Sequence, residues 1–89
     1  MQIEASHILV ESKEQAENLR SQILQGQEFA SVASQFSRCP SRSAGGNLGA
    51  FGRGQMVPEF EEAAFNLPVG SVSQPVQTQF GWHLIHRTS

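Results

Sequence analysis

Two of the three histidines and the only cysteine are the residues of this sequence whose side chains could carry chemistry. His7 lies in a strand-like run, Ile3 to Val10, on a face that is otherwise apolar, and His83 sits beside Ile85 in a second such run. A histidine on an apolar strand face is more often a structural residue held by one backbone or hydroxyl partner than a functional group. Cysteine together with histidine is also the pairing that nucleophilic thiol catalysis uses, so Cys39 must be weighed with them.

A thiol hydrolase and a metal centre are the chemical alternatives for these side chains. The hydrolase would also need an oxyanion hole, and no element for one is evident. A metal site would have to join His86 to the others, but His86 lies on the opposite strand face from His83 and no close-spaced ligand pair appears. We therefore expect no metal and no cofactor, and Cys39 is either a small buried filler or a positioned thiol.

A glycine-framed segment, Gly45 to Phe60, is the second unusual feature. It contains a strand-like run, Leu48 to Phe51, followed by Met56 and Phe60 on either side of a proline. Glycine is used where another chain must approach closely, so a short strand framed by glycines and followed by large apolar side chains suggests an exposed pocket. The alternative is a connector whose Met and Phe pack inside, and spacing alone favours that alternative.

The elements that must position these residues can be read from local signals. In the first half of the chain we predict a strand over 3–10, a helix from the capping box of Ser12 and Gln15, a short helix over 29–36 and a polar loop over 37–44. In the second half we predict a strand over 48–51, a helix beginning near Pro58, and a hairpin of strands 72–77 and 80–86 around Thr78 and Gln79. Strands and helices are mixed without a regular βαβ repeat. The order therefore predicts an α+β fold with a small, mostly antiparallel sheet.

Length and composition limit the class of protein. Residues 1–89 are enough for one domain with one modest core. The formal charge of -2 and the scattered Lys and Arg predict no nucleic-acid partner, and no apolar run is long enough for a membrane span. No signal peptide is recognisable and the single cysteine excludes an internal disulfide, so we expect a cytoplasmic protein, and a monomer.

Five segments of the chain resemble the parvulin family of peptidyl-prolyl isomerases. They are Ser6-His7-Ile8-Leu9-Val10, Ser37 to Ser41 with Cys39, Gly45-Gly46-Asn47-Leu48-Gly49-Ala50-Phe51, Gly54-Gln55-Met56-Val57-Pro58-Glu59-Phe60 and Phe80-Gly81-Trp82-His83-Leu84-Ile85. They occur in the family's order and spacing and cover essentially the whole chain, which looks most like the small single-domain bacterial parvulins. The resemblance implies a four-stranded antiparallel sheet wrapped by about four helices, in the order β-α-α-(α)-β-α-β-β.

The resemblance also implies roles for individual residues. By analogy, His7 and His83 form a hydrogen-bonded pair in the sheet behind the active site, and Cys39 faces the substrate amide. The remaining roles are apolar walls for the substrate proline ring at Leu48, Met56 and Phe60, added wall area at Phe80, a polar rim residue for the substrate backbone at Gln55, and a hydroxyl supporting the histidine pair at Thr78.

The implied activity is rotation about X–Pro bonds in unfolded or flexible polypeptides. Amide resonance opposes this rotation by about 18–20 kcal/mol, so an enzyme only has to bind the twisted amide better than either planar form. A covalent adduct with Cys39 is conceivable, but some family members carry Asp at the matching position. We therefore expect a non-covalent mechanism.

Substrate preference is partly readable. Phospho-specific relatives carry a long basic loop after the first strand, whereas Val10 here runs through Glu11 and Ser12 into a helix with only Lys13 nearby. We expect no preference for phosphorylated Ser or Thr before proline, and a preference for an apolar residue there. The alternative function is a module that binds prolyl peptides or unfolded chains, in the manner of a chaperone, with little catalysis.

Overall fold

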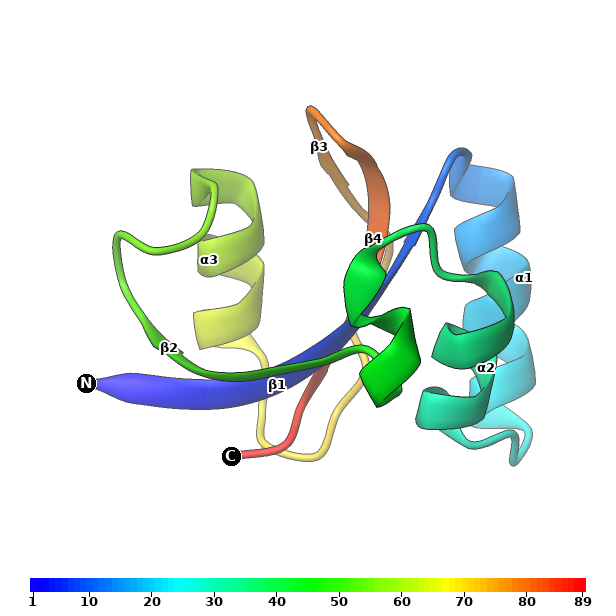
Figure 1. Ribbon diagram of the computed structural model, residues 1–89, viewed down its shortest axis with the longest axis horizontal. Coiled ribbons are helices and arrows are strands. Elements are labelled where there is room, and N and C mark those ends of the chain that lie inside the picture. Colours follow the sequence, from blue (N-terminus) through cyan, green and yellow to red (C-terminus); the bar gives the residue numbers. More distant parts are fainter.

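The computed structural model describes residues 1–89 and has a four-stranded antiparallel sheet at its centre, with strand order β2-β1-β4-β3 (Figure 1). The strands are β1 (Gln2–Val10), β2 (Asn47–Gly52), β3 (Val76–Thr78) and β4 (Gly81–Arg87). The first and last strands of the chain are therefore the two central ones. The predicted α+β fold with a four-stranded antiparallel sheet is confirmed.

Helices cover both faces of this sheet. They are α1 (Lys13–Leu24), α2 (Phe29–Phe36), the 3-10 helix η1 (Pro40–Ala44) and α3 (Pro58–Asn66). Figure 1 shows α1 and α2 together on one side of the sheet and α3 alone on the other. The predicted set of about four helices thus consists of three α-helices and one 3-10 helix. None of them has the length and hydropathy needed to span a bilayer.

The predicted helix starts are confirmed, because local chemistry sets them. Ser12 caps α1, where its Oγ accepts the backbone N–H of Gln15 at 3.1 Å. Pro58 occupies the first turn of α3, where its fixed φ suits the helix and its missing N–H has no intrahelical partner to lose.

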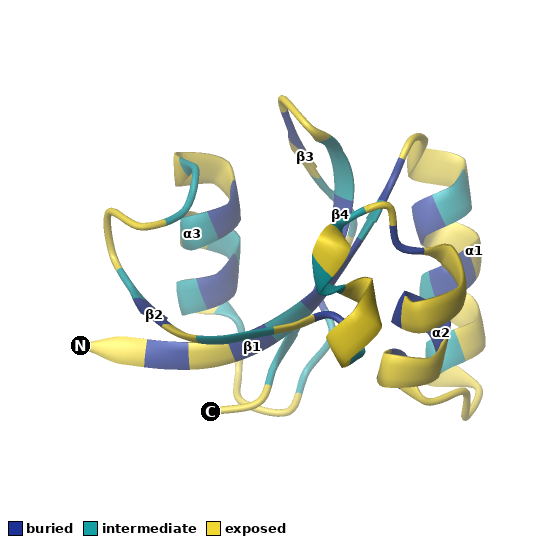
Figure 2. Ribbon diagram, in the orientation of Figure 1, coloured by how far each residue is buried: buried dark blue, intermediate teal, exposed yellow.

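Two separate apolar clusters pack on the two faces of the sheet, because successive strand residues point to opposite sides. Ile8, Val10 and Leu84 pack with α1 and α2. Ile3, Ala5 and Ile85 pack on the other face with Phe51, Phe60 and Ala64. Figure 2 shows that β1 alternates between exposed and buried residues at its start and is buried or half-buried from Ala5 to Val10, as expected where helices cover both faces.

Two expected boundaries are wrong. The strand predicted over 72–77 is a single bridge from Val72 to His86 followed by the short β3, because Pro75 has no backbone N–H for a ladder bond. Thr78 pairs with Gly81, so Phe80 lies in the hairpin turn rather than at the start of β4. The polar loop over 37–44 also contains η1, which begins at Pro40.

Candidate active site

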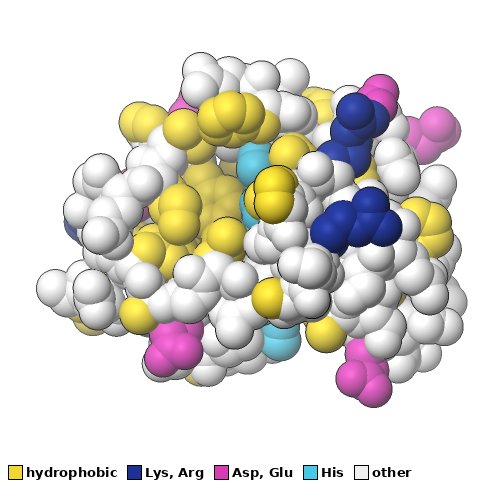
Figure 3. Space-filling view, in the orientation of Figure 1, with side chains coloured by type: hydrophobic (Ala, Val, Ile, Leu, Met, Phe, Trp, Pro, Cys, Tyr) yellow, Lys and Arg dark blue, Asp and Glu magenta, His cyan; other side chains and the backbone are white.

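A cavity of about 520 Å³ opens on the α3 side of the sheet. Figure 3 shows it as a hollow lined by hydrophobic side chains with histidine at its floor. Its walls come from the sheet, from the segment around Cys39, from the loop between β2 and α3, and from α3 itself. Segments that are far apart in the chain therefore contribute to one site.

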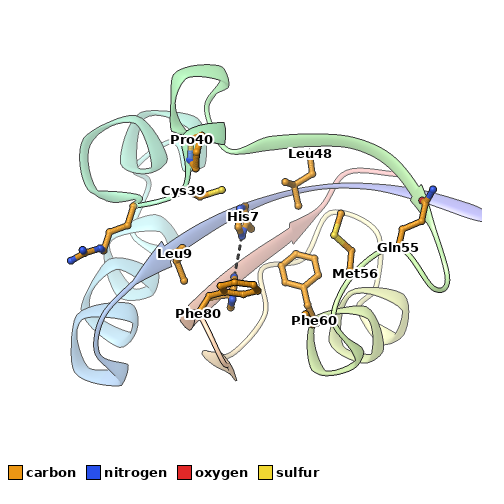
Figure 4. A pocket seen from close by; sticks show the side chains of 12 residues that line it. His7, Leu9, Cys39, Pro40, Leu48, Gln55, Met56, Phe60 and Phe80 are labelled. Carbon is orange, nitrogen blue, oxygen red and sulfur yellow. Dashed lines mark hydrogen bonds between the residues drawn. The ribbon is translucent and has the colours of Figure 1, made fainter.

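The two predicted histidines meet at the floor of this cavity. In the pairing of β1 with β4, Leu9 lies opposite His83 and His7 lies opposite Ile85, so the histidines are diagonal neighbours on one sheet face. Their Nδ1 atoms are 3.1 Å apart and their ring planes differ by 18° (Figure 4). The sheet register therefore holds the imidazoles as a hydrogen-bonded pair.

Thr78 extends this pair into a chain of hydrogen bonds. Its Oγ1 accepts the N–H of Phe80 at 3.2 Å and lies 2.7 Å from Nε2 of His83. Together with the contact between the two Nδ1 atoms, this links Thr78, His83 and His7 in one chain of hydrogen bonds. The other ring nitrogen of His7, Nε2, is buried and has no hydrogen-bond partner within the protein.

Burial keeps both imidazoles neutral. Desolvation, and then the nearby charge that His83 would carry, lower the pKa of His7 from 6.5 to about 4. Burial also lowers the pKa of His83. A charged imidazole is costly in this apolar setting, so the floor of the cavity carries no net charge at neutral pH.

Leu48, Met56 and Phe60 form the apolar cup, a wall of three side chains beside the histidine pair (Figure 4). Leu48 comes from β2, Met56 from the loop that follows, and Phe60 from the first turns of α3. The Phe60 ring is 3% exposed and stands edge-on to both imidazoles, at centroid distances of 5.5 and 5.3 Å. The cup and the histidines thus form one continuous surface.

Cys39 lines the cavity on the other side of His7 from the cup (Figure 4). Its segment is fastened to the end of β1, because the buried Ser37 Oγ accepts the N–H groups of both Leu9 and Cys39, at 3.1 and 3.3 Å. The N–H of Arg38 also donates to Leu9 O at 2.8 Å. The half-buried thiol is therefore held in place by the backbone and is not a core filler.

Close backbone packing explains part of the glycine-framed segment. The N–H of His7 donates to Gly46 O at 2.9 Å, and a Cβ on Gly46 would lie 2.3 Å from His7 O. Only glycine allows this approach, which also has a φ of +84°. The segment predicted as either a pocket or a connector is a pocket wall that rests on β1 at His7.

The rim contains the more polar and exposed residues. Gln55 lines the cavity as predicted, but its Oε1 accepts Gly52 N–H at 2.6 Å, so only its amide N–H groups are free for a substrate. Phe80 is 63% exposed and adds apolar surface from the hairpin turn. Arg38 is the one charged residue of the lining, and its guanidinium is paired with the carboxylate of Glu11.

Sequence reasoning missed several contributors. Leu9 and Val57 line the cavity, and signals for them existed, since Leu9 shares the strand face of His7 and Val57 follows Met56. The anchoring role of Ser37 had no local signal, because its partner Leu9 lies 28 positions away. No group of three His, Cys, Asp or Glu side chains lies close enough to hold a metal ion.

Known proteins match both the sequence and the structure. A family model described as a rotamase, or PPIC-type PPIase, domain matches residues 5–89. The chain is 51% identical over 86 residues to the foldase protein PrsA of Halalkalibacterium halodurans, which covers 96% of this chain and 26% of that protein. It therefore spans about a quarter of that relative's length.

Solved structures give the same result. The structure of the peptidylprolyl isomerase PrsA from Bacillus anthracis superposes with a TM-score of 0.97 at 42% identity, covering 99% of this chain and 41% of that one. NmPin, the parvuline of Nitrosopumilus maritimus, superposes with a TM-score of 0.91 at 40% identity, covering 99% of this chain and 96% of that one. The fold is thus that of a peptidyl-prolyl isomerase domain. The chain belongs to the PPIC-type family of these enzymes, the parvulins.

Proposed function

We propose that this domain accelerates rotation about X–Pro bonds in unfolded or flexible polypeptides, by a non-covalent mechanism that favours the twisted amide. The observation that carries the proposal is the continuity of the apolar cup with a neutral histidine pair and a positioned thiol. In this arrangement the proline ring occupies the cup and its amide bond crosses the floor towards Cys39.

The physical basis is differential binding of the twisted amide. The planar amide has a charge-separated resonance form, which an apolar cavity floored by uncharged imidazoles solvates poorly. The twisted amide has lost that resonance and is penalised less. With the ring held in the cup, rotation moves only the carbonyl side of the bond. Each 1.36 kcal/mol removed from the barrier is about tenfold in rate.

Cys39 acts electrostatically in this proposal, near the substrate carbonyl oxygen, and forms no bond to it. Cys39→Asp tests this role, because Asp is polar but cannot form a thioester. We expect the variant to retain activity within about tenfold of the parent. A folded but inactive variant, together with a trapped thioester in the parent, would establish the covalent mechanism instead.

The charges at the rim support a preference for substrates without a phosphate group before proline. Arg38 is the one cation of the lining and is already paired with Glu11, so a phosphate before proline would meet no free cationic cluster. Leu9 and the exposed Phe80 add apolar surface to the lining of the cavity. This surface supports a preference for an apolar residue before proline. Exchange rates across a series of X–Pro peptides test both points. Faster turnover of phosphoserine peptides than of leucine peptides would contradict the first, and equal turnover of glutamate and leucine peptides the second.

A binding module with little catalysis is the second candidate. The chain spans only part of the relatives named foldases, which favours this candidate. A domain inside a larger protein can bind a polypeptide without catalysing its isomerisation. A protease-coupled prolyl exchange assay separates the two functions. Catalytic acceleration supports the isomerase, whereas peptide binding seen by NMR without acceleration supports the binding module.

We also propose a monomer in a reducing, cytoplasmic compartment, with polypeptides as its partners and with neither nucleic acid nor a membrane among them. The lone half-buried cysteine and the net charge of -2 support this assignment. Light scattering after size exclusion tests the oligomeric state, and fractionation of cells with a thiol-state assay tests the compartment.

A further inference from the structure

We propose that Glu61 is a positioning residue for the isomerase reaction, because it holds the cup loop, residues 53–57, in the conformation that keeps Met56 in the apolar cup. This inference rests on the proposed function and names a residue of α3 that has no place in the cavity lining. It concerns the one wall of the cup that comes from a loop rather than from a strand or helix.

The Glu61 carboxylate binds the cup loop through both of its oxygens. Oε1 accepts the backbone N–H of Gly54 at 2.6 Å, and Oε2 accepts from Nη1 of Arg53 at 3.2 Å. The Glu61 side chain is only 18% exposed, compared with 58% for Arg53. Hydrogen bonds to an ionised and partly buried acceptor are the strong ones, so the bond from Gly54 is the principal attachment.

Around Gly54, the cup loop has little packing to fix its backbone. Arg53, Gly54 and Gln55 are exposed, and nothing lies within 4 Å of the position that a Cβ on Gly54 would occupy. The φ of Gly54 is +88°, a conformation that glycine adopts without cost but that no packing enforces. Met56 and Val57 pack on the apolar cluster of the open face, and the Arg53 guanidinium lies over the Phe65 ring at 4.4 Å. The hydrogen bonds that hold the loop are those of Glu61 and the bond between Gly52 and Gln55.

The loop leads directly from this fastening to the cup. Met56 comes two residues after Gly54, and both Met56 and Val57 line the cavity. Met56 itself is unbranched and adaptable, so its place in the cup depends on where the backbone presents it. Releasing Gly54 from Glu61 would let the loop sample other conformations, and the cup would then have to be ordered by each substrate that binds.

A purely structural role for Glu61 is the competing explanation. It lies near the N-terminus of α3, where an acidic residue also favours the helix through the macrodipole. Glu62 is the matched control. It is the next residue of the same helix, and its carboxylate contacts only the side chain of Asn66 on the exposed surface.

The test compares three variants by kcat and KM for an X–Pro peptide. Glu61→Ala is expected to raise KM about fivefold to tenfold with kcat within about twofold. The reason is that part of the free energy of substrate binding is then used to order the cup loop. Glu61→Gln is expected to restore KM to within about twofold, since its amide oxygen can still accept from Gly54. Glu62→Ala is expected to match the parent. Equal effects of the two alanine variants, or a Gln variant as damaged as the Ala variant, would overturn the inference.

Two further measurements separate this inference from the proposed function. In a Met56→Ala background, Glu61→Ala should change KM less than about twofold, because the two substitutions act on the same wall. Amide hydrogen exchange at Gly54 should be faster in Glu61→Ala but not in Glu62→Ala, because only the Gly54 N–H is bound by Glu61. If the parent does not catalyse prolyl isomerisation, the proposed function is wrong. The amide hydrogen exchange at Gly54 still shows in that case whether Glu61 holds the cup loop. Unchanged exchange at Gly54 would refute the positioning role whatever the activity.

Discussion

The two faces of the sheet are built from alternate residues of the same strands, yet one is closed and the other is open. On the closed face, Ile8, Val10 and Leu84 are buried against residues of α1 and α2. On the open face, the corresponding apolar cluster is interrupted by His7 and His83, and the space above them is the cavity. One strand pair therefore supplies a rigid core and an active-site floor at the same time.

The two faces differ in the kind of side chain that they bury, and this difference shows which face stabilises the domain and which one holds polar groups. The cluster of the closed face consists of apolar side chains, which need no hydrogen-bond partners. The open face buries two imidazoles and the Thr78 hydroxyl, which are tolerated because they hydrogen-bond to one another in a chain. The single helix α3 leaves part of this face uncovered, and a substrate proline ring can use that space.

The largest effect is expected from breaking the closed face. Leu84 is fully buried, so Leu84→Ala should lower the free energy of unfolding by about 2–5 kcal/mol, through lost burial and the cavity left behind. Denaturant unfolding measures this change. Phe80→Ala, at an exposed position on the open side, is the control and should change stability by less than about 0.5 kcal/mol. Similar losses in the two variants would contradict the contrast between the faces.

The second-largest effect is expected from protonation of His7 on the open face, which should lower the free energy of unfolding. The unfolded state binds protons at His7 near pH 6.5, whereas the folded state resists until about pH 4. Stability is therefore complete above pH 6.5 and is lost as the pH falls towards 4, by an amount on the order of 3 kcal/mol. Denaturant unfolding at several pH values checks this slope. A flat profile between those pH values in the parent would contradict the prediction.

Shortening the cup should affect activity more than stability. Met56 is only half-buried, and Met56→Ala removes one wall of the proposed proline site. We expect kcat/KM to fall about tenfold, equivalent to about 1.4 kcal/mol, with the unfolding free energy lowered by no more than about 1 kcal/mol. Prolyl exchange and denaturant unfolding measured on the same samples decide the matter. A loss of stability as large as that of Leu84→Ala would mean that the open face is an ordinary core.

The smallest effect concerns the charge at the rim. Glu11→Gln frees Arg38 from its ion pair, and the exposed guanidinium can then attract an acidic residue before proline. Turnover of glutamate–proline peptides relative to leucine–proline peptides should rise about twofold, because exposed ion pairs are worth little. The gain should disappear at high salt. An increase that persists in 1 M salt would require an explanation other than charge.

Features that depend on near neighbours could be predicted from the sequence. The helix starts at Ser12 and Pro58 are examples, as is the shared face of His7 with Ile3 and Ala5. The strand predicted over 72–77 failed because its hydrogen-bond ladder is interrupted between the bridge at Val72 and the start of β3 at Val76, where Pro75 has no N–H to donate. Most of the candidate site was reached through the resemblance to a family, since periodicity alone left the histidines and the glycine-framed segment with several interpretations.

The sequence by itself determined the periodicities, the caps, the turn glycines and the supply of side chains for an apolar pocket, because these depend on residues within a turn or two of one another. Only the tertiary structure decided which distant residues meet. His7 and His83 are 76 positions apart, and the pairing register of β1 with β4 sets their contact. The fastening of Gly54 by Glu61 likewise depends on where α3 docks. Such contacts are decided by the packing of whole elements, which no local pattern specifies.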